Sequence, residues 1–178
     1  GAWVYTIDNT DSDTTALDAD DSVTDAFTIT ATDSDQSSSN TDTMTVTITI
    51  TGANDAPTIT ASDNTGAVTE DAGTTTASDT LVFTDDDTDD TTLAWSMSGA
   101  TDNGATQTLA GTYGSLVVTE ASGAWTYTID NTDSDTTALD ADDSVSDAFT
   151  VIGTDTNGGS DTETVTITLT GANDATSA

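Results

Sequence analysis

The sequence predicts an all-β fold, an antiparallel β-sandwich of about seven strands per repeat. Three observations predict it. Apolar and polar residues alternate along many segments, no segment carries an apolar stripe of helical period, and a unit of about 120 residues occurs one and a half times in the 178 residues. A period of two places the apolar residues on one face of a strand. The threonines between them favour strands and suit the solvent-exposed face.

The alternation also separates a folded chain from an acidic coil. Residues 43–51 place Met44, Val46, Ile48 and Ile50 between threonines, and residues 165–169 repeat the pattern. The other alternating sets are Trp3, Tyr5 and Ile7; Trp125, Tyr127 and Ile129; Phe27 and Ile29; Phe149 and Val151; and Leu93, Trp95 and Met97. A disordered acidic chain has no reason to alternate in this way, so these residues are expected to form a core, with Trp3, Trp95 and Trp125 in it.

Turn residues divide the complete unit into seven predicted strands. These strands are residues 57–61 (which 67–70 can continue), 80–84, 92–97, 113–119, 124–129, 148–154 and 162–170. Asn103-Gly104 marks a turn, and residues 157–159 close the last hairpin. Residues 131–147 are too polar for a strand and are expected to contain a short helical turn around Ala138 and Leu139. Seven strands in a domain of this size are typical of an immunoglobulin-type sandwich.

An internal repeat sets the predicted domains. Residues 1–27 return at 123–149 with two differences, and residues 52–55 return at 171–174. Residues 1–56 are therefore interpreted as the C-terminal half of one repeat, and residues 57–178 as a complete repeat that ends in a linker to the next. The half repeat supplies only its last three strands. We expect the chain to be an excerpt of a longer tandem array or to be completed by another copy. The lack of an initiator Met, a signal peptide and a membrane-spanning apolar run fits an excerpt.

The charge and the missing residue types exclude nucleic-acid binding and most catalytic mechanisms. The chain has 33 acidic residues and no Lys, Arg, His or Cys, for a net charge of −33. Without basic side chains it cannot neutralise nucleic-acid phosphates, and without His or Cys it has no imidazole base, thiolate nucleophile or ordinary zinc site. Nothing places two carboxylates in an apolar pocket, so no enzyme activity is expected. The remaining oxygen ligands are those that Ca²⁺ prefers.

The run of residues 111–174, with its G-x-W-x-Y-x-I-D-N-T block and T-G-x-N-D ending, resembles the VCBS repeat of giant bacterial surface adhesins of the repeats-in-toxin type. This family is similar in architecture to cadherin-like domains. The resemblance covers nearly the whole chain and implies a tandem immunoglobulin/cadherin-like sandwich at the bacterial cell surface. It also implies calcium at the junctions between repeats, held by a strand-five acid, an N-D linker, a D-x-D after strand two and an A-x-D after strand six.

Sandwich topology and this pattern together place the expected calcium ligands. At the junction inside the chain they are Asp8, Asn54, Asp55, Asp85, Asp87 and Asp155; at the next junction Glu70, Asp130, Asn173 and Asp174; and at the preceding one Asp33 and Asp35. Five acids occupy the six positions 85–90, and two unit charges about 4 Å apart repel by roughly 4 kcal/mol at intermediate dielectric. The chain departs from the cadherin pattern where Ile7-Asp8-Asn9 replaces a D-x-E, which leaves the number of ions open.

The expected function is that of a non-catalytic extender in a secreted bacterial adhesin, stiffened by Ca²⁺ between repeats and supporting cell adhesion or biofilm formation. Its expected partners are adjacent repeats of the same chain, with no nucleic acid and no membrane insertion. Two alternatives remain open. The chain can be the protomer of an extracellular filament in which an identical neighbour completes the half repeat, or it can be a module that binds a glycan or a cell.

Overall fold

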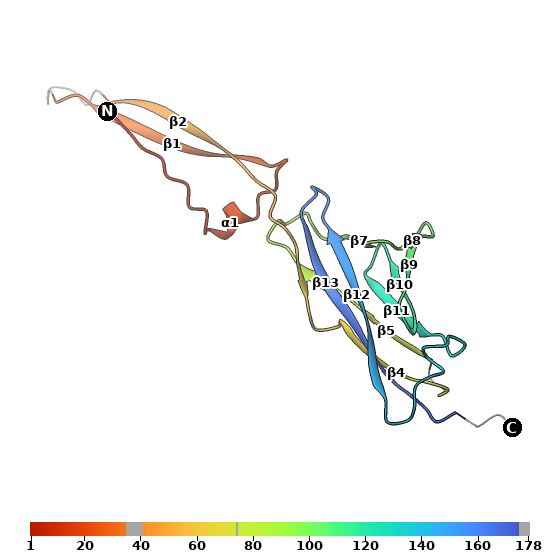
Figure 1. The fold of residues 1–178 in the computed structure, drawn as a ribbon. Coiled ribbons are helices and arrows are strands. Elements are labelled where there is room, and N and C mark those ends of the chain that lie inside the picture. Colours follow the sequence, from red (N-terminus) through yellow and green to blue (C-terminus); the bar gives the residue numbers. More distant parts are fainter. Residues whose placement is uncertain (35–40, 74, 175–178) are drawn as a thin grey trace. The chain divides into compact units, whose positions relative to one another are not determined.

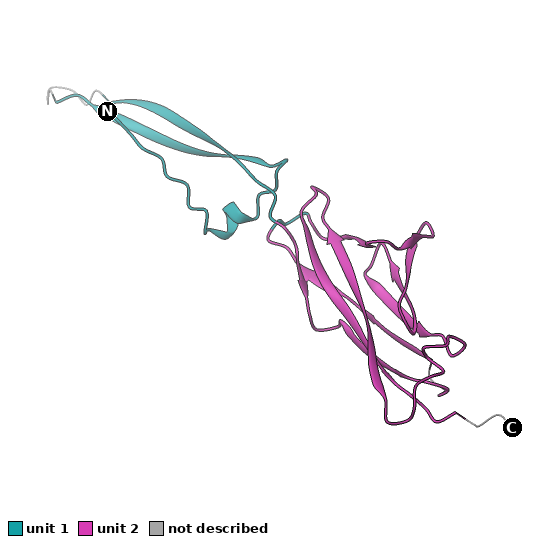
Figure 2. Ribbon diagram, in the orientation of Figure 1, with its two compact units in different colours: residues 1–55, 87–89 teal, residues 56–86, 90–178 magenta. Residues whose placement is uncertain are grey.

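The computed structural model describes residues 1–34, 41–73 and 75–174 (Figure 1). They form two compact units, coloured separately in Figure 2: unit 1 contains residues 1–55 and 87–89, and unit 2 contains residues 56–86 and 90–178. The candidate ligand Asp35 lies outside the described residues. Among the described residues there is no helix long and apolar enough to cross a membrane.

Unit 2 is a β-sandwich, which confirms the predicted fold class. One sheet has the order β5 (Thr76–Thr80), β11 (Ala124–Ile129), β10 (Gly114–Thr119), β9 (Thr106–Ala110) and β8 (Thr101–Asp102). The other has the order β4 (Thr65–Thr69), β13 (Ser160–Thr170), β12 (Ser144–Thr154) and β7 (Ala94–Met97), and β3 (Thr58–Thr60) pairs separately with β6 (Val82–Thr84). Every pair is antiparallel except β13 with β4, which is parallel.

The core lies between the two sheets and is built by the predicted alternation. Burial along β11 and β13 follows a period of two, with threonines on the outer face. Its buried residues are Ile59, Val68, Leu81, Leu93, Trp95, Met97, Leu116, Val118, Trp125, Tyr127, Ile129, Phe149, Val151, Val165, Ile167 and Leu169. The predicted placement of Trp95 and Trp125 is therefore correct.

Several predicted strand boundaries in unit 2 are wrong. The sequence analysis missed β5 and β9, because Ala77 and Leu109 are the main apolar residues in two otherwise polar strands that are held by backbone pairing to β11 and β10. Strand β12 begins at Ser144, four residues before the predicted start, because its polar first residues pair with the end of β13. Residues 131–143 form turns.

A buried carboxylate joins the two sheets of unit 2. The Asp147 side chain on β12 accepts hydrogen bonds from the Tyr127 hydroxyl at 2.8 Å and from the backbone amides of Thr112 and Tyr113 at 2.8 and 3.0 Å. Burial raises the pKa of the Tyr127 hydroxyl, and its hydrogen bond to Asp147 raises it further, so this hydroxyl remains a donor at neutral pH. A side chain at Gly111 would collide with the Asp147 carboxylate, which explains the glycine there.

Unit 1 contains a hairpin of β1 (Ser22–Thr32) and β2 (Thr41–Thr51) and one short helix, α1 (Ser12–Thr15). The helix occupies positions that correspond to residues 134–137 of the second copy, earlier than the predicted helical turn. The predicted strand at residues 3–7 belongs to no sheet. Trp3 is 54% exposed, so the prediction that it is a core residue is wrong for unit 1.

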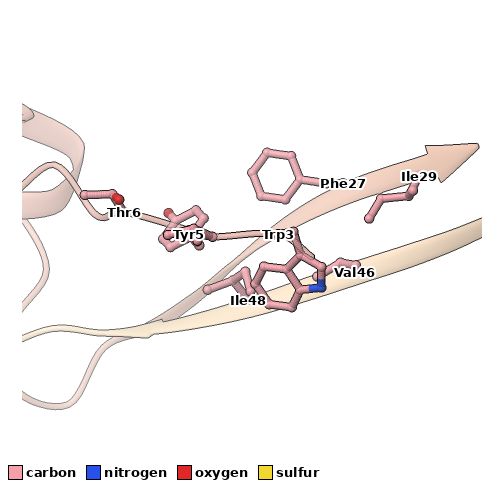
Figure 3. Close-up of a pocket in the computed structure, with 8 residues that line it drawn as sticks. Trp3, Tyr5, Thr6, Phe27, Ile29, Val46 and Ile48 are labelled. Carbon is pink, nitrogen blue, oxygen red and sulfur yellow. The ribbon is translucent and has the colours of Figure 1, made fainter. Parts of the chain in front are cut away.

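Unit 1 nevertheless keeps the local contacts of the repeat. The Tyr5 hydroxyl donates to Asp25 at 2.6 Å, as Tyr127 donates to Asp147. The ring centroids of Tyr5 and Phe27, which Figure 3 shows, lie 6.0 Å apart with an interplanar angle of 54°, and the Tyr127 and Phe149 rings have the same distance and angle. The two copies therefore share the Tyr–Asp hydrogen bond and the Tyr–Phe ring packing that their common sequence produces. They differ in whether other strands cover these side chains.

Candidate calcium sites

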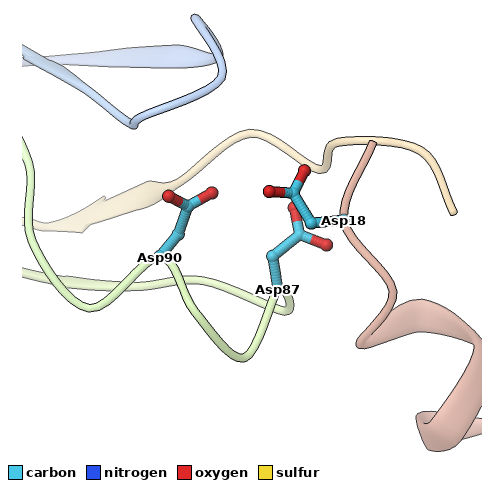
Figure 4. Close-up of side chains that lie close together, drawn as sticks. All are labelled: Asp18, Asp87 and Asp90. Atoms are coloured by element: carbon cyan, nitrogen blue, oxygen red, sulfur yellow. The ribbon is translucent and has the colours of Figure 1, made fainter. Parts of the chain in front are cut away.

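The main candidate site lies within unit 2, where the loop after β6 approaches the loop after β12. Carboxylate oxygens of Asp85, Asp90 and Asp155 all lie within 4.8 Å of one another. Asp85 directly follows β6 and Asp155 directly follows β12, so the two strand ends fix their positions. Figure 4 shows Asp87 and Asp90 on the loop after β6.

Asp90 supplies the observation that points to a ligand. Its side chain is only 3% exposed. Its Oδ1 atom accepts hydrogen bonds from the Thr156 hydroxyl at 2.6 Å and the Thr156 amide at 3.3 Å. Its Oδ2 atom is buried and accepts no hydrogen bond from the described residues. A buried carboxylate oxygen without a partner costs free energy unless something positive satisfies it.

A tight turn orients Asp155. Its Oδ1 atom accepts hydrogen bonds from the amides of Asn157, Gly158 and Gly159 at 2.9, 2.6 and 2.8 Å. Gly158 has a φ of 98°, a conformation that strongly favours glycine, so the Asn-Gly-Gly sequence allows the amides to converge. The predicted hairpin turn therefore also holds a carboxylate of the candidate site.

The chemistry of this group fits a calcium ion. Three carboxylates this close repel one another, by roughly 4 kcal/mol for a pair at 4 Å and intermediate dielectric. The chain has no Lys, Arg or His to neutralise them. Calcium takes six to eight oxygen ligands, and carboxylates and backbone carbonyls are its usual protein ligands. We conclude that Asp85, Asp90 and Asp155 fit the ion that the family resemblance implies.

The remaining predicted ligands of this junction lie in unit 1. Asp87 accepts a hydrogen bond from the Asp55 amide at 2.7 Å, and the Asn54 side-chain amide donates to the Asp55 carbonyl at 2.7 Å. Asp8 accepts from the Thr10 hydroxyl and amide, and these hydrogen bonds lower the pKa of its exposed carboxyl. The hypothesis that Asp8, Asn54, Asp55 and Asp87 share one ligand shell with Asp85 and Asp155 stays a prediction.

A second acidic group lies elsewhere in unit 2. Carboxylate oxygens of Glu70, Asp71 and Asp174 lie within 4.8 Å of one another. Glu70 is buried and accepts a hydrogen bond from the Ala172 amide at 3.0 Å, which ties the end of β4 to the segment after β13. Asp71 has a φ of 52°, which turns the chain directly after Glu70. The structure thus brings together Glu70 and Asp174, two of the residues predicted for the next junction.

The other predicted residues of the outer junctions behave differently. Asp130 is outside the Glu70 group in the described structure; its carboxylate accepts from the Thr132 hydroxyl and amide, which lowers its pKa. The Asn173 side chain donates to the Asp174 carbonyl at 3.2 Å. Asp33 is exposed immediately after β1. Ligand roles for Asp130, Asn173 and Asp33 stay predictions.

Two acidic residues of these groups were not selected from the sequence. Asp90 was treated only as part of the acidic run, because the cadherin pattern directs attention to the D-x-D at positions 85 and 87. The sequence feature that could have identified Asp90 is its position shortly before Leu93 and β7, which are buried, so that Asp90 is buried with them. Asp71 was missed because neither its positive φ nor the closeness of its carboxylate to that of Asp174 is apparent from the sequence.

Comparison with known proteins decides the family. The model of the bacterial cadherin-like domain matches residues 54–171, most of the chain. The chain belongs to the bacterial cadherin-like domain family. No curated protein matches the chain. The match confirms the cadherin-like character of the repeat that the sequence analysis predicted.

Solved structures similar to this cadherin-like chain include three cadherin fragments. Protocadherin gamma B2 extracellular cadherin domains 3–6 matches at 18% identity over 83% of this chain and 32% of its own, with a TM-score of 0.45. Drosophila N-cadherin EC1–4 matches at 20% identity over 85% of this chain and 34% of its own, with a TM-score of 0.43. Mouse protocadherin-24 EC1–3 matches at 18% identity over 82% of this chain and 45% of its own, with a TM-score of 0.41. The chain spans less than half the length of each.

Proposed function

We propose that this chain is a non-catalytic, calcium-binding extender module of an extracellular bacterial adhesin that supports cell adhesion or biofilm formation. The observation that carries the proposal is that Asp90, whose buried Oδ2 atom accepts no hydrogen bond from the described residues, has a carboxylate oxygen within 4.8 Å of carboxylate oxygens of Asp85 and Asp155. The family is that of cadherin-like modules, and the composition lacks the side chains that most enzyme mechanisms need. Ion binding at a domain end gives such a module its mechanical role.

The linker sequence supports a role at junctions. Asp55 and Asp174 occupy equivalent positions in the two copies of the G-A-N-D linker. The Asp55 backbone amide donates a hydrogen bond to the Asp87 carboxylate, and Asp87 belongs to the acidic run of residues 85–90. The Asp174 carboxylate lies close to those of Glu70 and Asp71. The Asp174 linker thus contributes to an acidic group, and the Asp55 linker is hydrogen-bonded to a residue of the acidic run. An ion bound at such a group would restrain the linker, so that successive repeats form a stiffer rod.

Small-angle X-ray scattering of the full chain tests the extender role. We expect the distribution of interatomic distances to be narrower in millimolar calcium than in chelator, because the ion removes repulsion among Asp85, Asp90 and Asp155 and any linker oxygen that completes its ligand shell would be restrained. The Asp90→Asn variant should give the chelator profile in both conditions. Identical profiles for the parent chain with and without calcium would contradict the stiffening role.

A further inference from the structure

An exposed Asn-Gly pair lies in the turn that holds the Asp155 carboxylate. Asn157 and Gly158 are exposed and belong to the turn between β12 and β13. Asp155 is buried and is one of the three carboxylates of the main candidate calcium site. A chemical change at Asn157 therefore takes place two positions from a candidate ligand of the ion.

An asparagine followed by glycine is the sequence in which side-chain deamidation meets the least steric obstruction. The backbone nitrogen of the second residue attacks the asparagine Cγ atom, and a glycine there carries no Cβ that hinders the approach. No described atom beyond its chain neighbours lies within 4 Å of the place where a Cβ of Gly158 would stand. The Gly158 nitrogen is therefore accessible to the Asn157 side chain and to water.

The reaction consumes water and releases ammonia. The Gly158 nitrogen forms a bond to Asn157 Cγ, the Cγ–Nδ2 bond breaks, and the amide proton leaves with the ammonia. Water then opens the resulting cyclic imide at either of its carbonyl carbons. Opening at Cγ gives aspartate at position 157. Opening at the backbone carbonyl gives isoaspartate, in which the main chain continues through the side-chain carbons.

The hydrogen bonds of the turn oppose the first step. The Gly158 amide donates to Asp155 Oδ1 at 2.6 Å, and the Asn157 and Gly159 amides donate to the same atom at 2.9 and 2.8 Å. The cyclic imide has no N–H, so the Gly158 nitrogen must give up this hydrogen bond in order to react. An ion at the candidate calcium site would fix the Asp155 carboxylate and thereby the turn. Without the ion, repulsion among the carboxylates of the site loosens the turn.

We propose that Asn157-Gly158 is a deamidation site that bound calcium protects and whose isoaspartate product disables the Asp155 group. The inference rests on the proposed calcium-binding function. Isoaspartate lengthens the main chain between residues 157 and 158, so that the three amides no longer converge on Asp155 Oδ1. A chain kept without calcium is thus converted, irreversibly, to a form that binds the ion weakly.

Asn103-Gly104, the other Asn-Gly pair of the chain, is a matched internal control. Both of its residues are exposed, and the Gly104 amide donates to Asp102 Oδ1 at 2.7 Å. Among the described residues, Asp102 belongs to none of the acidic groups that could hold a metal ion. Calcium should therefore leave the deamidation rate of Asn103 unchanged. Each site is compared with itself, so a difference between their basal rates does not affect the result.

Peptide mass spectrometry of the full chain after incubation at mildly alkaline pH measures both rates. Chymotrypsin is used for the digest, since the chain has no Lys or Arg for trypsin. Asn157 should convert roughly fivefold faster in chelator than in saturating calcium, because a saturating ion leaves little of the ion-free form. The rate at Asn103 should change less than about twofold. Persistence of Asn157 in chelator while Asn103 converts, or calcium-independent conversion of Asn157, would overturn the inference.

Calcium titration of the separated products tests the consequence. In an Asn103→Gln background, the isoaspartate form should bind calcium about tenfold more weakly than the unreacted chain, the scale of loss expected when the partners that orient a ligand are removed. Asn157→Asp carries the same added charge on an unchanged main chain and should stay within about threefold. Equal binding by the isoaspartate form and the unreacted chain would overturn the inference.

The same titration separates this inference from the proposed function. Absence of calcium binding by the unreacted chain would overturn the proposed function and this inference with it. Calcium binding by the unreacted chain, together with calcium-independent conversion of Asn157, would overturn this inference alone. Asn157→Gln should bind calcium as the parent does and resist conversion at this position, because its longer side chain closes a ring far more slowly.

Discussion

Chelation of calcium is expected to lower the midpoint of thermal unfolding of unit 2 by roughly 10 °C relative to saturating calcium. A ligand present at a hundred times its Kd and bound only to the folded state stabilises that state by about 2.7 kcal/mol. For a domain of this size, each kcal/mol corresponds to about 4 °C. Removal of the ion also restores the repulsion among Asp85, Asp90 and Asp155. Differential scanning calorimetry with and without chelator measures the change.

A matched pair of loop variants assigns this effect to the Asp90 group. Asp90→Asn should abolish the gain from calcium, because Asp90 is buried within the group. Asp89→Asn removes the same charge from an exposed neighbour and should keep most of the gain. Equal loss of the calcium effect in both variants would indicate diffuse counterion attraction instead of a built site.

Phe149→Ala is expected to destabilise unit 2 by about 3–5 kcal/mol, the usual cost of deleting a buried aromatic ring. The equivalent change Phe27→Ala should cost less than about 1 kcal/mol, since this side chain is 48% exposed in unit 1. The two residues share the same local sequence, so the difference between the two losses of stability measures the contribution of the sheet that covers Phe149 in unit 2. The free energy of unfolding is measured by denaturant titration.

The Trp3→Phe background isolates the effect of Phe149→Ala, because the remaining Trp95 and Trp125 both lie in the core of unit 2, whereas Phe27→Ala is followed by Trp3 fluorescence in a chain that keeps Trp3. In the Trp3→Phe background the fluorescence reports unit 2 alone, and a chain of two units is not required to unfold in one step. Equal unfolding free energies for the parent and Phe149→Ala would contradict the packing described for β12.

The sandwich was predictable because its core strands carry their own pattern. Residues such as Val165, Ile167 and Leu169 alternate with threonines and are buried as expected. Strands β5 and β9 were not predictable in this way, since backbone pairing to neighbours distant in sequence holds them and their side chains carry little periodicity. The exposure of Trp3 was missed for a related reason: local alternation identifies an apolar face, but not whether another segment covers it.

The candidate calcium sites were partly predictable. Strand-end acids such as Asp85, Asp155 and Glu70 follow from topology, because they come directly at the ends of identifiable strands. Asp90 and Asp71 depend on the path of a loop, which places Asp90 beside Thr156 and gives Asp71 its positive φ. Such loop geometry is set by tertiary contacts, and no periodic pattern in the sequence encodes it.

The central claim is that calcium binds at Asp85, Asp90 and Asp155, and anomalous diffraction from crystals grown in millimolar calcium tests it most directly. We predict an anomalous peak at about 2.3–2.6 Å from Asp90 Oδ2, with oxygens of Asp85 and Asp155 in the same ligand shell. A map without a peak among these residues, in which the three carboxylates turn apart toward ordered water, would contradict the account.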